Sequence, residues 1–238
     1  MYNITKFIDM LNKIGVTLTE KQVNQFLKYY EMLVEKNKVM NLTSITEFDE
    51  VIEKHFVDSL QIAQYVDLTQ EVSIIDVGTG AGFPGIPLKI AFPEIKVTLL
   101  DSLNKRINFL NEVIDELGLE KITALHGRAE DYGKNGTYRE QFDYCVSRAV
   151  ANMSSLSEYC LPFVKVGGSF VPYKSGNIDD ELEQAKKAVF LLGGKIEKVE
   201  KFALSEAQRS FVFIKKEKNT AKKYPRKAGL PTKEPLGM

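Results

Sequence analysis

The stretch SIIDVGTGAGFPG, at positions 73–85, decides the fold of this chain. Its first half is apolar and predicts a buried β-strand that ends near Asp76. The turn that follows carries four glycines, Gly78, Gly80, Gly82 and Gly85. Because glycine has no bulky side chain, a ligand can approach the main chain closely and meet the amides at the start of the next helix. The stretch therefore predicts a cofactor-binding loop between a strand and a helix.

Short apolar runs alternate with helical patterns from Val72 onward, which predicts βαβ units and a mostly parallel sheet. We expect strands near 72–77, 96–101, 121–126, 142–147, 167–173, 195–202 and 209–216, and helices near 84–91, 103–117, 151–163 and 178–192. The last two strands are too close in sequence for a parallel crossover, so they should form an antiparallel hairpin. The predicted fold class is α/β, with a Rossmann-like, seven-stranded sheet whose last strand is antiparallel.

The first 66 residues show helical periodicity without strand alternation. A first helix should end at Gly15, and the spacing of Thr19 and Gln22 predicts a capping box that opens a second helix. A third helix should run through Val51 and Ile62. We therefore divide the chain into a helical N-terminal cap (1–66), a sheet domain (67–216) and a basic C-terminal tail (217–238).

The charges of the chain balance overall but are unevenly placed. The 32 basic and 32 acidic residues cancel, so no global field draws the protein toward nucleic acid or membrane. Positions 215–238, however, hold eight basic and two acidic residues, a net charge of +6 that leaves −6 on the other 214 residues. Any attraction to a polyanion must therefore be local, and the tail is the basic patch.

The cysteine pattern indicates a reducing compartment. Cys145 and Cys160 form no C-x-x-C pair, and His55 and His126 are far apart, so neither a disulfide scaffold nor a metal site is expected. The N-terminus lacks the apolar segment of a signal peptide, and the longest uncharged run, at 77–88, holds four glycines and two prolines. We expect a cytoplasmic protein with no membrane partner.

Two cofactor classes fit the glycine loop. Gly80, Gly82 and Gly85 match the G-x-G-x-x-G dinucleotide fingerprint, and Asp101 ends the next strand at a spacing that is also seen with NAD. A nicotinamide-dependent oxidoreductase is therefore one alternative. Three other features favour S-adenosylmethionine, namely Asp76 directly before the glycines, a proline within the turn, and the closing hairpin.

A site for S-adenosylmethionine gives each residue of the loop a task. The backbone at Gly78 and Gly80 would lie against the methionine and ribose portions, and Phe83 would cover the cofactor. Asp101 can accept hydrogen bonds from both ribose hydroxyls, although it could instead be a helix N-cap. After the third strand, Ala129 is small enough for an adenine to pack on the chain, unless positions 127–130 are only a solvated loop.

No nucleophile or acid–base pair stands out in the sequence. Cys145 and Cys160 are expected in the core, because no basic neighbour would activate a thiol. His55 shares a polar helix face with Lys54, which on periodicity alone favours a solvated surface. The fourth strand ends in CVSRAV, which lacks the (Asp/Asn)-Pro-Pro-aromatic and Pro-Cys motifs of adenine-N6 and cytosine-C5 methyltransferases.

Six motifs follow one another along nearly the whole chain: NLTSI (41–45), KHFVDSL (54–60), DVGTGAGFPGIPLKI (76–90), GRAE (127–130), SRAVA (147–151) and KYPRKAGLP (223–231). By these motifs the chain resembles the glucose-inhibited division protein B family, the bacterial 16S rRNA (guanine-N7) methyltransferases G. The resemblance implies a class I S-adenosylmethionine-dependent methyltransferase that acts on N7 of a guanine in 16S rRNA, position 527 in the usual rRNA numbering. It also implies a cofactor site that includes Gly78, Phe83, Ala129, Glu130 and Arg148.

Guanine N7 carries an exposed lone pair and no proton, so its methylation needs no general base. This explains the missing acid–base motif, and we predict that Arg148 orients the cofactor, the base O6 or a phosphate. N7 lies on the major-groove edge, which A-form RNA buries too deeply for side chains. The target guanine should therefore lie in a loop or be flipped out, with Phe83 or Tyr173 as a stacking platform.

The partner implied by the resemblance is 16S rRNA, whether free, in an assembly intermediate or in the small ribosomal subunit, and a monomeric enzyme is expected. The candidate phosphate-binding residues are Lys54 and His55 on the third helix and Lys222, Lys223, Arg226 and Lys227 in the tail. Such contacts would make the affinity fall steeply with salt. A non-catalytic RNA-binding factor remains a third alternative, because it would bind RNA without transferring a methyl group.

Overall fold

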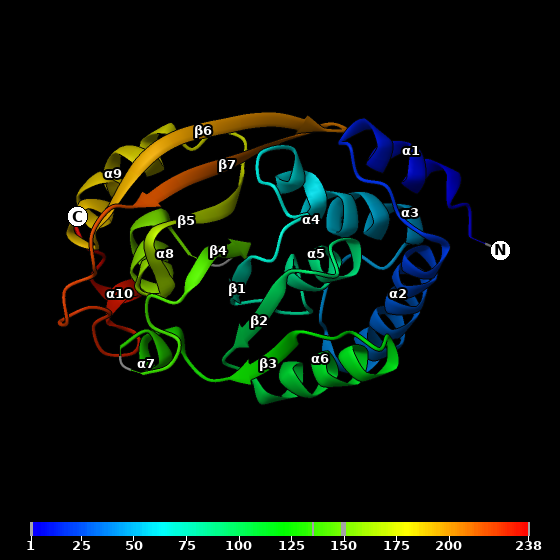
Figure 1. Ribbon diagram of the computed structural model, residues 1–238, viewed down its shortest axis with the longest axis horizontal. Coiled ribbons are helices and arrows are strands. Elements are labelled where there is room, and N and C mark those ends of the chain that lie inside the picture. Colours follow the sequence, from blue (N-terminus) through cyan, green and yellow to red (C-terminus); the bar gives the residue numbers. More distant parts are fainter. Residues whose placement is uncertain (1, 135, 149–150, 238) are drawn as a thin grey trace.

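Figure 1 shows the computed structural model, which describes residues 2–134, 136–148 and 151–237. Within these residues seven strands form one sheet in the order β3-β2-β1-β4-β5-β7-β6. The strands are β1 (Ser73–Val77), β2 (Lys96–Asp101), β3 (Ile122–His126), β4 (Phe142–Arg148), β5 (Val164–Ser175), β6 (Gly194–Leu204) and β7 (Ala207–Lys216). The first five strands pair in parallel, whereas β7 is antiparallel to both β5 and β6. The predicted seven-stranded sheet with an antiparallel last strand is confirmed.

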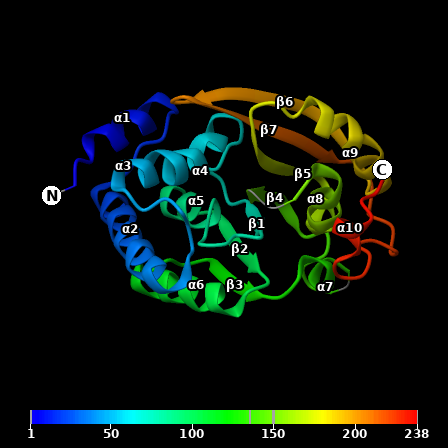
Figure 2. The ribbon, with the colours of Figure 1, turned by 180° about the vertical axis from the view of Figure 1, so that it is seen from behind.

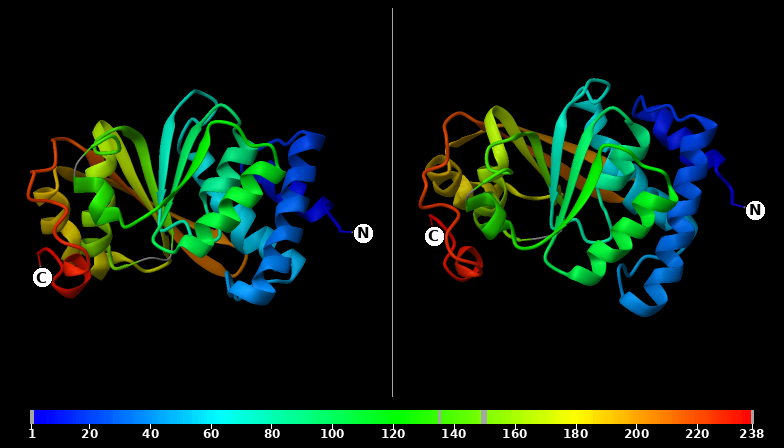
Figure 3. Two further views of the ribbon diagram at one scale, coloured as in Figure 1. Left: turned by 90° about the horizontal axis from the view of Figure 1, so that it is seen from below. Right: turned by 60° about the horizontal axis from the view of Figure 1, so that its bottom comes forward.

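Helices cover both faces of this sheet (Figure 3). One layer holds α1 (Thr5–Lys13), α2 (Glu20–Met40), α3 (Phe48–Val51), α4 (Asp58–Leu60), α5 (Gly85–Ala91) and α6 (Asn104–Glu116). The other holds α7 (Ala129–Lys134), α8 (Met153–Cys160), the 3-10 turn η3 (Leu161–Phe163) and α9 (Asp179–Leu191). Side chains of β1 alternate between the layers, since Ile74 joins the first core and Ile75 the second. Within the described residues, no helix is long and apolar enough to cross a membrane.

The N-terminal helices share one hydrophobic core with the sheet, and they brace the glycine turn. The predicted capping box at the start of α2 is present, with the Thr19 and Gln22 side chains each bonded to the other residue's backbone. From the same helix, Tyr29 donates its hydroxyl to the Ala81 carbonyl oxygen at 2.5 Å, and Gln22 donates to the Ile90 carbonyl oxygen at 2.8 Å. The helical cap therefore holds both the turn and the end of α5.

Two local features differ from the expected pattern. The third helix is not regular, because a π-helix, η1 (Ile52–Val57), interrupts it between α3 and α4, and a 3-10 turn, η2 (Gln61–Gln64), ends it. Such π-helical turns occur often at functional sites. The sequence also did not predict α7, where a loop was expected around Ala129. Both differences lie beside the hollows described below.

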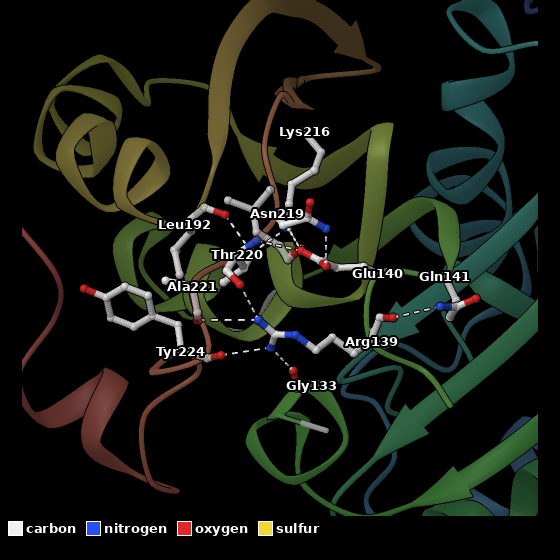
Figure 4. Close-up of polar contacts among 11 residues, drawn as sticks. Gly133, Arg139, Glu140, Gln141, Leu192, Lys216, Asn219, Thr220, Ala221 and Tyr224 are labelled. Atoms are coloured by element: carbon white, nitrogen blue, oxygen red, sulfur yellow. Dashed lines mark hydrogen bonds and ion pairs between the residues drawn. The ribbon is translucent and has the colours of Figure 1, made fainter. Parts of the chain in front are cut away.

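The described part of the basic tail, residues 217–237, is docked on the domain and includes the short helix α10 (Leu230–Lys233), beside α7 and α8 (Figure 2). Two residues just before β4 hold its first part, as Figure 4 shows. The Arg139 guanidinium donates to the carbonyl oxygens of Thr220 and Tyr224 at 2.6 and 2.9 Å. The Glu140 carboxylate accepts from the Thr220 amide and the Asn219 side chain, both at 2.6 Å. The tail is therefore an ordered part of the fold.

Candidate active site

The glycine turn forms the floor of the candidate site, between β1 and α5. Gly78 and Gly80 have φ of +72° and +63°, a region that favours glycine. Gly85 is required for a different reason, because a Cβ there would lie 2.3 Å from the Leu99 side chain. The turn is thus shaped by backbone conformation in its middle and by close packing where α5 begins.

Asp76 lies beneath this turn and is fully buried. Its Oδ2 accepts from the Thr79 hydroxyl at 2.7 Å and from the Gly85 amide at 2.9 Å, so it ties the start of the turn to its end. Its Oδ1 is buried without a hydrogen-bond partner among the described residues. Burial raises the pKa of Asp76 to about 6. This oxygen fits a ligand that brings a hydrogen-bond donor to the turn.

A hollow of about 470 Å³ opens over the carboxyl ends of β1, β2 and β3, a volume typical of ligand sites. We call it the cofactor hollow. Asp101, at the end of β2, is one of the two buried carboxylates that line it. It accepts from the amides of Gly80 and Leu103, each at 2.9 Å, and Arg106 approaches it to 3.2 Å. It does not cap α6, whose N-cap is Leu103. Asp101 is therefore held in position at the ligand-facing edge of the sheet.

The far wall of the cofactor hollow combines α7 with the C-terminal tail. Ala129 and the buried Glu130 stand at the start of α7, and Gly229 and Thr232 of the tail face the same hollow. Glu130 Oε1 accepts from the Gly229 amide at 2.9 Å, and the Tyr159 hydroxyl lies 2.6 Å from that of Thr232. Glu130 therefore lines the hollow and also fixes the tail there.

The structure gives Arg226 a different environment from that expected of a phosphate-binding residue. Its guanidinium contacts the fully buried carboxylate of Glu158 through Nε at 3.0 Å and Nη2 at 2.7 Å, and its backbone amide donates to the same carboxylate at 2.7 Å. The neighbouring Lys222, Lys223 and Lys227 are exposed. Arg226 thus anchors the tail from within, whereas the three lysines can meet a polyanion.

A second hollow of about 460 Å³ lies over the carboxyl ends of β4 and β5, against η1 and α4. We call it the substrate-side hollow. Asp58, only 4% exposed, joins two arginines there. Its Oδ2 accepts from Arg148 Nη1 at 2.9 Å and its Oδ1 from Arg209 Nε at 3.2 Å. Arg148 was predicted to belong to the cofactor site, yet it lines this second hollow and not the cofactor hollow, while Arg209 was not predicted.

His55 and Phe83 pack beneath Arg148. The two rings stack at 4.6 Å, and the Arg148 guanidinium lies 5.0 Å from the centre of the Phe83 ring. Burial, together with the charge of Arg148, lowers the pKa of His55 to about 3, so this imidazole is neutral near pH 7. His55 therefore brings no positive charge to a phosphate. Phe83, predicted to cover the cofactor or stack on a base, is itself buried beneath these residues.

The remaining predicted residues divide between core and surface. Lys54 is exposed and pairs with Glu50 one turn away. Tyr173 is buried but lines the substrate-side hollow, and its hydroxyl donates to the Ser59 carbonyl oxygen at 2.8 Å. Cys145 and Cys160 are both buried, as expected. Ala149 and Val150 of the SRAVA motif lie outside the described residues.

Several residues of these hollows were missed. Asp58 carried a signal, because it sits on the polar face that Lys54 and His55 share, but that face was interpreted as a solvated surface. Arg209 carried none, since its partner Asp58 is 151 positions away. With His55 neutral, four cations and two carboxylates line the substrate-side hollow, namely Lys54, Arg148, Lys174, Arg209, Asp58 and Glu181. The net charge is therefore +2, which suits an anionic substrate.

Comparisons with known proteins agree on both sequence and fold. Residues 22–212 match the family model described as rRNA small subunit methyltransferase G. A protein named ribosomal RNA small subunit methyltransferase G from Lachnoclostridium phytofermentans is 52% identical over 238 residues, which span 99% of this chain and 98% of that protein. One of the same name from Oceanobacillus iheyensis is 51% identical, covering 97% and 98% of the two chains.

Solved structures with low sequence identity share the fold. A SAM-dependent methyltransferase from Aquifex aeolicus superposes with a TM-score of 0.55 at 17% identity, covering 73% of this chain and 96% of that one. A precorrin-6y C5,15-methyltransferase from Geobacter metallireducens gives 0.51 at 14% identity, covering 67% and 87%. The chain therefore shares its fold with these two methyltransferases.

Proposed function

Because this chain belongs to the rRNA small subunit methyltransferase G family, we propose that it transfers the methyl group of S-adenosylmethionine to N7 of a guanine in 16S rRNA. The observation that supports N7 as the methylated atom is the chemistry of the substrate-side hollow. Its histidine has a pKa of about 3, and both oxygens of Asp58 are engaged by arginines. Neither residue is suited to remove a proton near pH 7, and N7 is a nucleophile that carries none.

The cofactor hollow suits S-adenosylmethionine, which when bound supplies an electrophilic methyl group on a sulfonium sulfur. Asp101, fixed by two amides, would accept from the ribose hydroxyls. Gly78 lines the hollow and Gly80 adjoins it, so backbone can lie against the ligand, while Ala129 leaves room for the adenine. Asp76, which lies beneath the turn, would either accept a hydrogen bond from the cofactor through Oδ1 or hold the glycine turn in its conformation through Oδ2.

The chemical contribution of the chain is positional. Holding a nucleophile and an electrophile in line can lower a barrier by about 7 to 11 kcal/mol in well-oriented systems. Positive charge moves onto the purine during transfer, so a free cation at N7 would oppose the reaction. Asp58 partly offsets the charge of Arg148 and fixes its direction. Arg148 would therefore donate to O6 or a phosphate and orient the base without acting on its protons.

RNA would reach this site with the guanine flipped out or in a loop, since the major groove of A-form RNA does not admit side chains. Lys54 and the exposed tail lysines Lys222, Lys223 and Lys227 would contact phosphates around the two hollows. The proposal includes a monomeric enzyme that works in the cytoplasm on 16S rRNA, free or within a small subunit or its precursor. It also includes the division into a helical cap, a catalytic domain and a tail.

Methyl-labelled S-adenosylmethionine provides the test. Incubated with small subunits, assembly intermediates or naked 16S rRNA, the enzyme should yield labelled 7-methylguanosine after nuclease digestion. Label found only on a small molecule would refute an RNA substrate. Fluorescence titration with NADH and NADPH checks the oxidoreductase alternative, and RNA binding without any transfer of label would identify a non-catalytic binding factor.

A further inference from the structure

We propose that Glu181 recognises the Watson–Crick edge of the target guanine within the substrate-side hollow. This inference rests on the proposed function, and it concerns how the enzyme selects guanine. Adenine also carries an N7 lone pair, so the chemistry of the transfer does not separate the two purines. A donor to O6 on the N7 edge, one of the roles proposed for Arg148, favours guanine, and a contact to the Watson–Crick edge adds a second, independent criterion.

The substrate-side hollow spans the carboxyl edge of the sheet, between the two helical layers. Alternation along β5 sends Tyr173 toward the first layer, where it meets Ser59, and Lys174 toward the second, where it meets Glu181 at the start of α9. Arg148 turns toward the first layer, to Asp58. The hollow therefore has one wall built around arginines and a second wall that presents Glu181.

Of the two carboxylates that line this hollow, only Glu181 has an oxygen without a hydrogen-bond partner among the described residues. The Asp58 oxygens each receive an arginine. Glu181 uses Oε1 alone, which accepts from the Met153 amide and from Lys174 Nζ, both at 2.6 Å. Within residues 2–134, 136–148 and 151–237, its Oε2 receives no hydrogen bond. The side chain is 29% exposed, so the oxygen is accessible from the hollow but partly shielded from bulk water.

Guanine is the base whose chemistry matches this oxygen. Its Watson–Crick edge, opposite N7, presents two donors, N1–H and the exocyclic N2 amine. Adenine presents an acceptor at N1 and only a C–H at position 2, and its 6-amino donor lies where guanine carries O6. In the same pose it would therefore set the N1 lone pair against the carboxylate. A site built to hydrogen-bond its substrate rejects the analogue that lacks the group, because its buried polar atoms are left unpaired.

Met153 and Lys174 hold the carboxylate in place by one oxygen, so the second oxygen is oriented before the base arrives. Lys174 is fixed in turn by the Ala151 carbonyl oxygen, which accepts from it at 2.9 Å. If Glu181 were purely structural, it would bind only Met153 and Lys174, and its replacement would slow methylation equally for every base. If Glu181 recognises guanine, its replacement should matter less for a base that lacks the 2-amino group. The test must therefore vary the substrate together with the enzyme.

The test is a cycle of two enzymes and two substrates. Small subunits are reconstituted with 16S rRNA that carries either guanosine or inosine at the target position, because inosine keeps N7 and N1–H but lacks the 2-amino group. For the wild type, kcat/KM should fall about 10- to 100-fold with inosine, the range for loss of a specific base contact. Glu181→Gln should be slower with guanosine and should distinguish the two bases by less than about threefold.

Control variants distinguish the role of Glu181 from a loss of folding and from a failure of the proposed function. Glu183→Gln on the outer face of α9, where Glu183 pairs with Lys186, should retain the wild-type ratio. Binding of S-adenosylmethionine should be equal in all three proteins, which shows that the variants fold. A Glu181→Gln variant that keeps the wild-type ratio of guanosine to inosine would overturn the inference alone. A wild type that forms no 7-methylguanosine on unmodified subunits would overturn the proposed function, and the inference with it.

Discussion

Replacement of Arg226 by alanine should unfold the tail from its anchor and lower the stability of the whole protein. The change leaves the Glu158 carboxylate, which is fully buried, without its cationic partner. Breaking a buried ion pair in this way costs about 3 to 5 kcal/mol, and we expect the low end because 20% of the Arg226 side chain is exposed. For a chain of this size, about 3 kcal/mol corresponds to a decrease in Tm of roughly 6 to 12 °C.

The same variant should bind S-adenosylmethionine more weakly, although Arg226 does not line the cofactor hollow. Gly229 and Thr232 follow the anchor within a few residues and form part of that hollow, so a released tail leaves one wall incomplete. Thermal melts and calorimetric titration with S-adenosylmethionine measure the two effects. Lys227→Ala is the matched control, because the adjacent side chain is exposed and its loss should change stability by no more than about 0.5 kcal/mol.

The alternative is that Arg226 contacts an RNA phosphate. In that case Arg226→Ala would melt like Lys227→Ala and would reduce the slope of log affinity against log salt by about 1. That pair of results would refute the anchoring role. A double variant, Glu158→Gln with Arg226→Gln, adds a second check, because removing both charges should cost less than removing the arginine alone.

Three further predictions concern the two hollows and the tail surface. Asp101→Asn should weaken S-adenosylmethionine binding by roughly 10- to 100-fold, since charge-assisted hydrogen bonds contribute about 1.5 to 3 kcal/mol, and an unchanged Kd by calorimetry would exclude its ribose role. The pKa of His55 is about 3 when folded and near 6.5 when unfolded, so its stabilisation is complete above pH 6.5 and is lost as pH falls toward 3; His55→Gln should flatten stability across this window in urea titrations. Replacing Lys222, Lys223 and Lys227 together by alanine should lower the RNA affinity and its dependence on salt, while the binding of S-adenosylmethionine stays unchanged. An equal loss of RNA affinity and cofactor affinity would contradict separate roles for the tail lysines and the cofactor hollow.

Local sequence patterns predicted the architecture well, because strand alternation and turn conformation depend on residues that are close in sequence. The glycine turn, Asp101 and the capping box of α2 all depend on spacings of a few positions, and the structure shows each where it was expected. The π-helix at Ile52–Val57 was missed because one inserted residue barely changes the spacing of apolar positions. Propensity alone does not distinguish it from a regular helix.

The polar pairings were not predictable from sequence for a different reason. Asp58 meets Arg209 across 151 positions, and Glu158 meets Arg226 across 68. A charged residue near the end of a chain has the same local pattern whether it is solvated or buried against a distant partner. Only the packed tail reveals that Arg226 differs from the lysines beside it.

The docked tail also changes how damage to the gene should be judged. A nonsense codon just after Lys216 would spare every strand of the sheet, and the product would still contain the glycine turn and Asp101. Yet it would lack Gly229 and Thr232 at the cofactor hollow, and Glu130 and Glu158 would lose the tail groups that donate hydrogen bonds to them. A truncation after Lys216 should therefore inactivate the protein, so mutations that remove residues 217–237 weigh as much as mutations in the glycine turn.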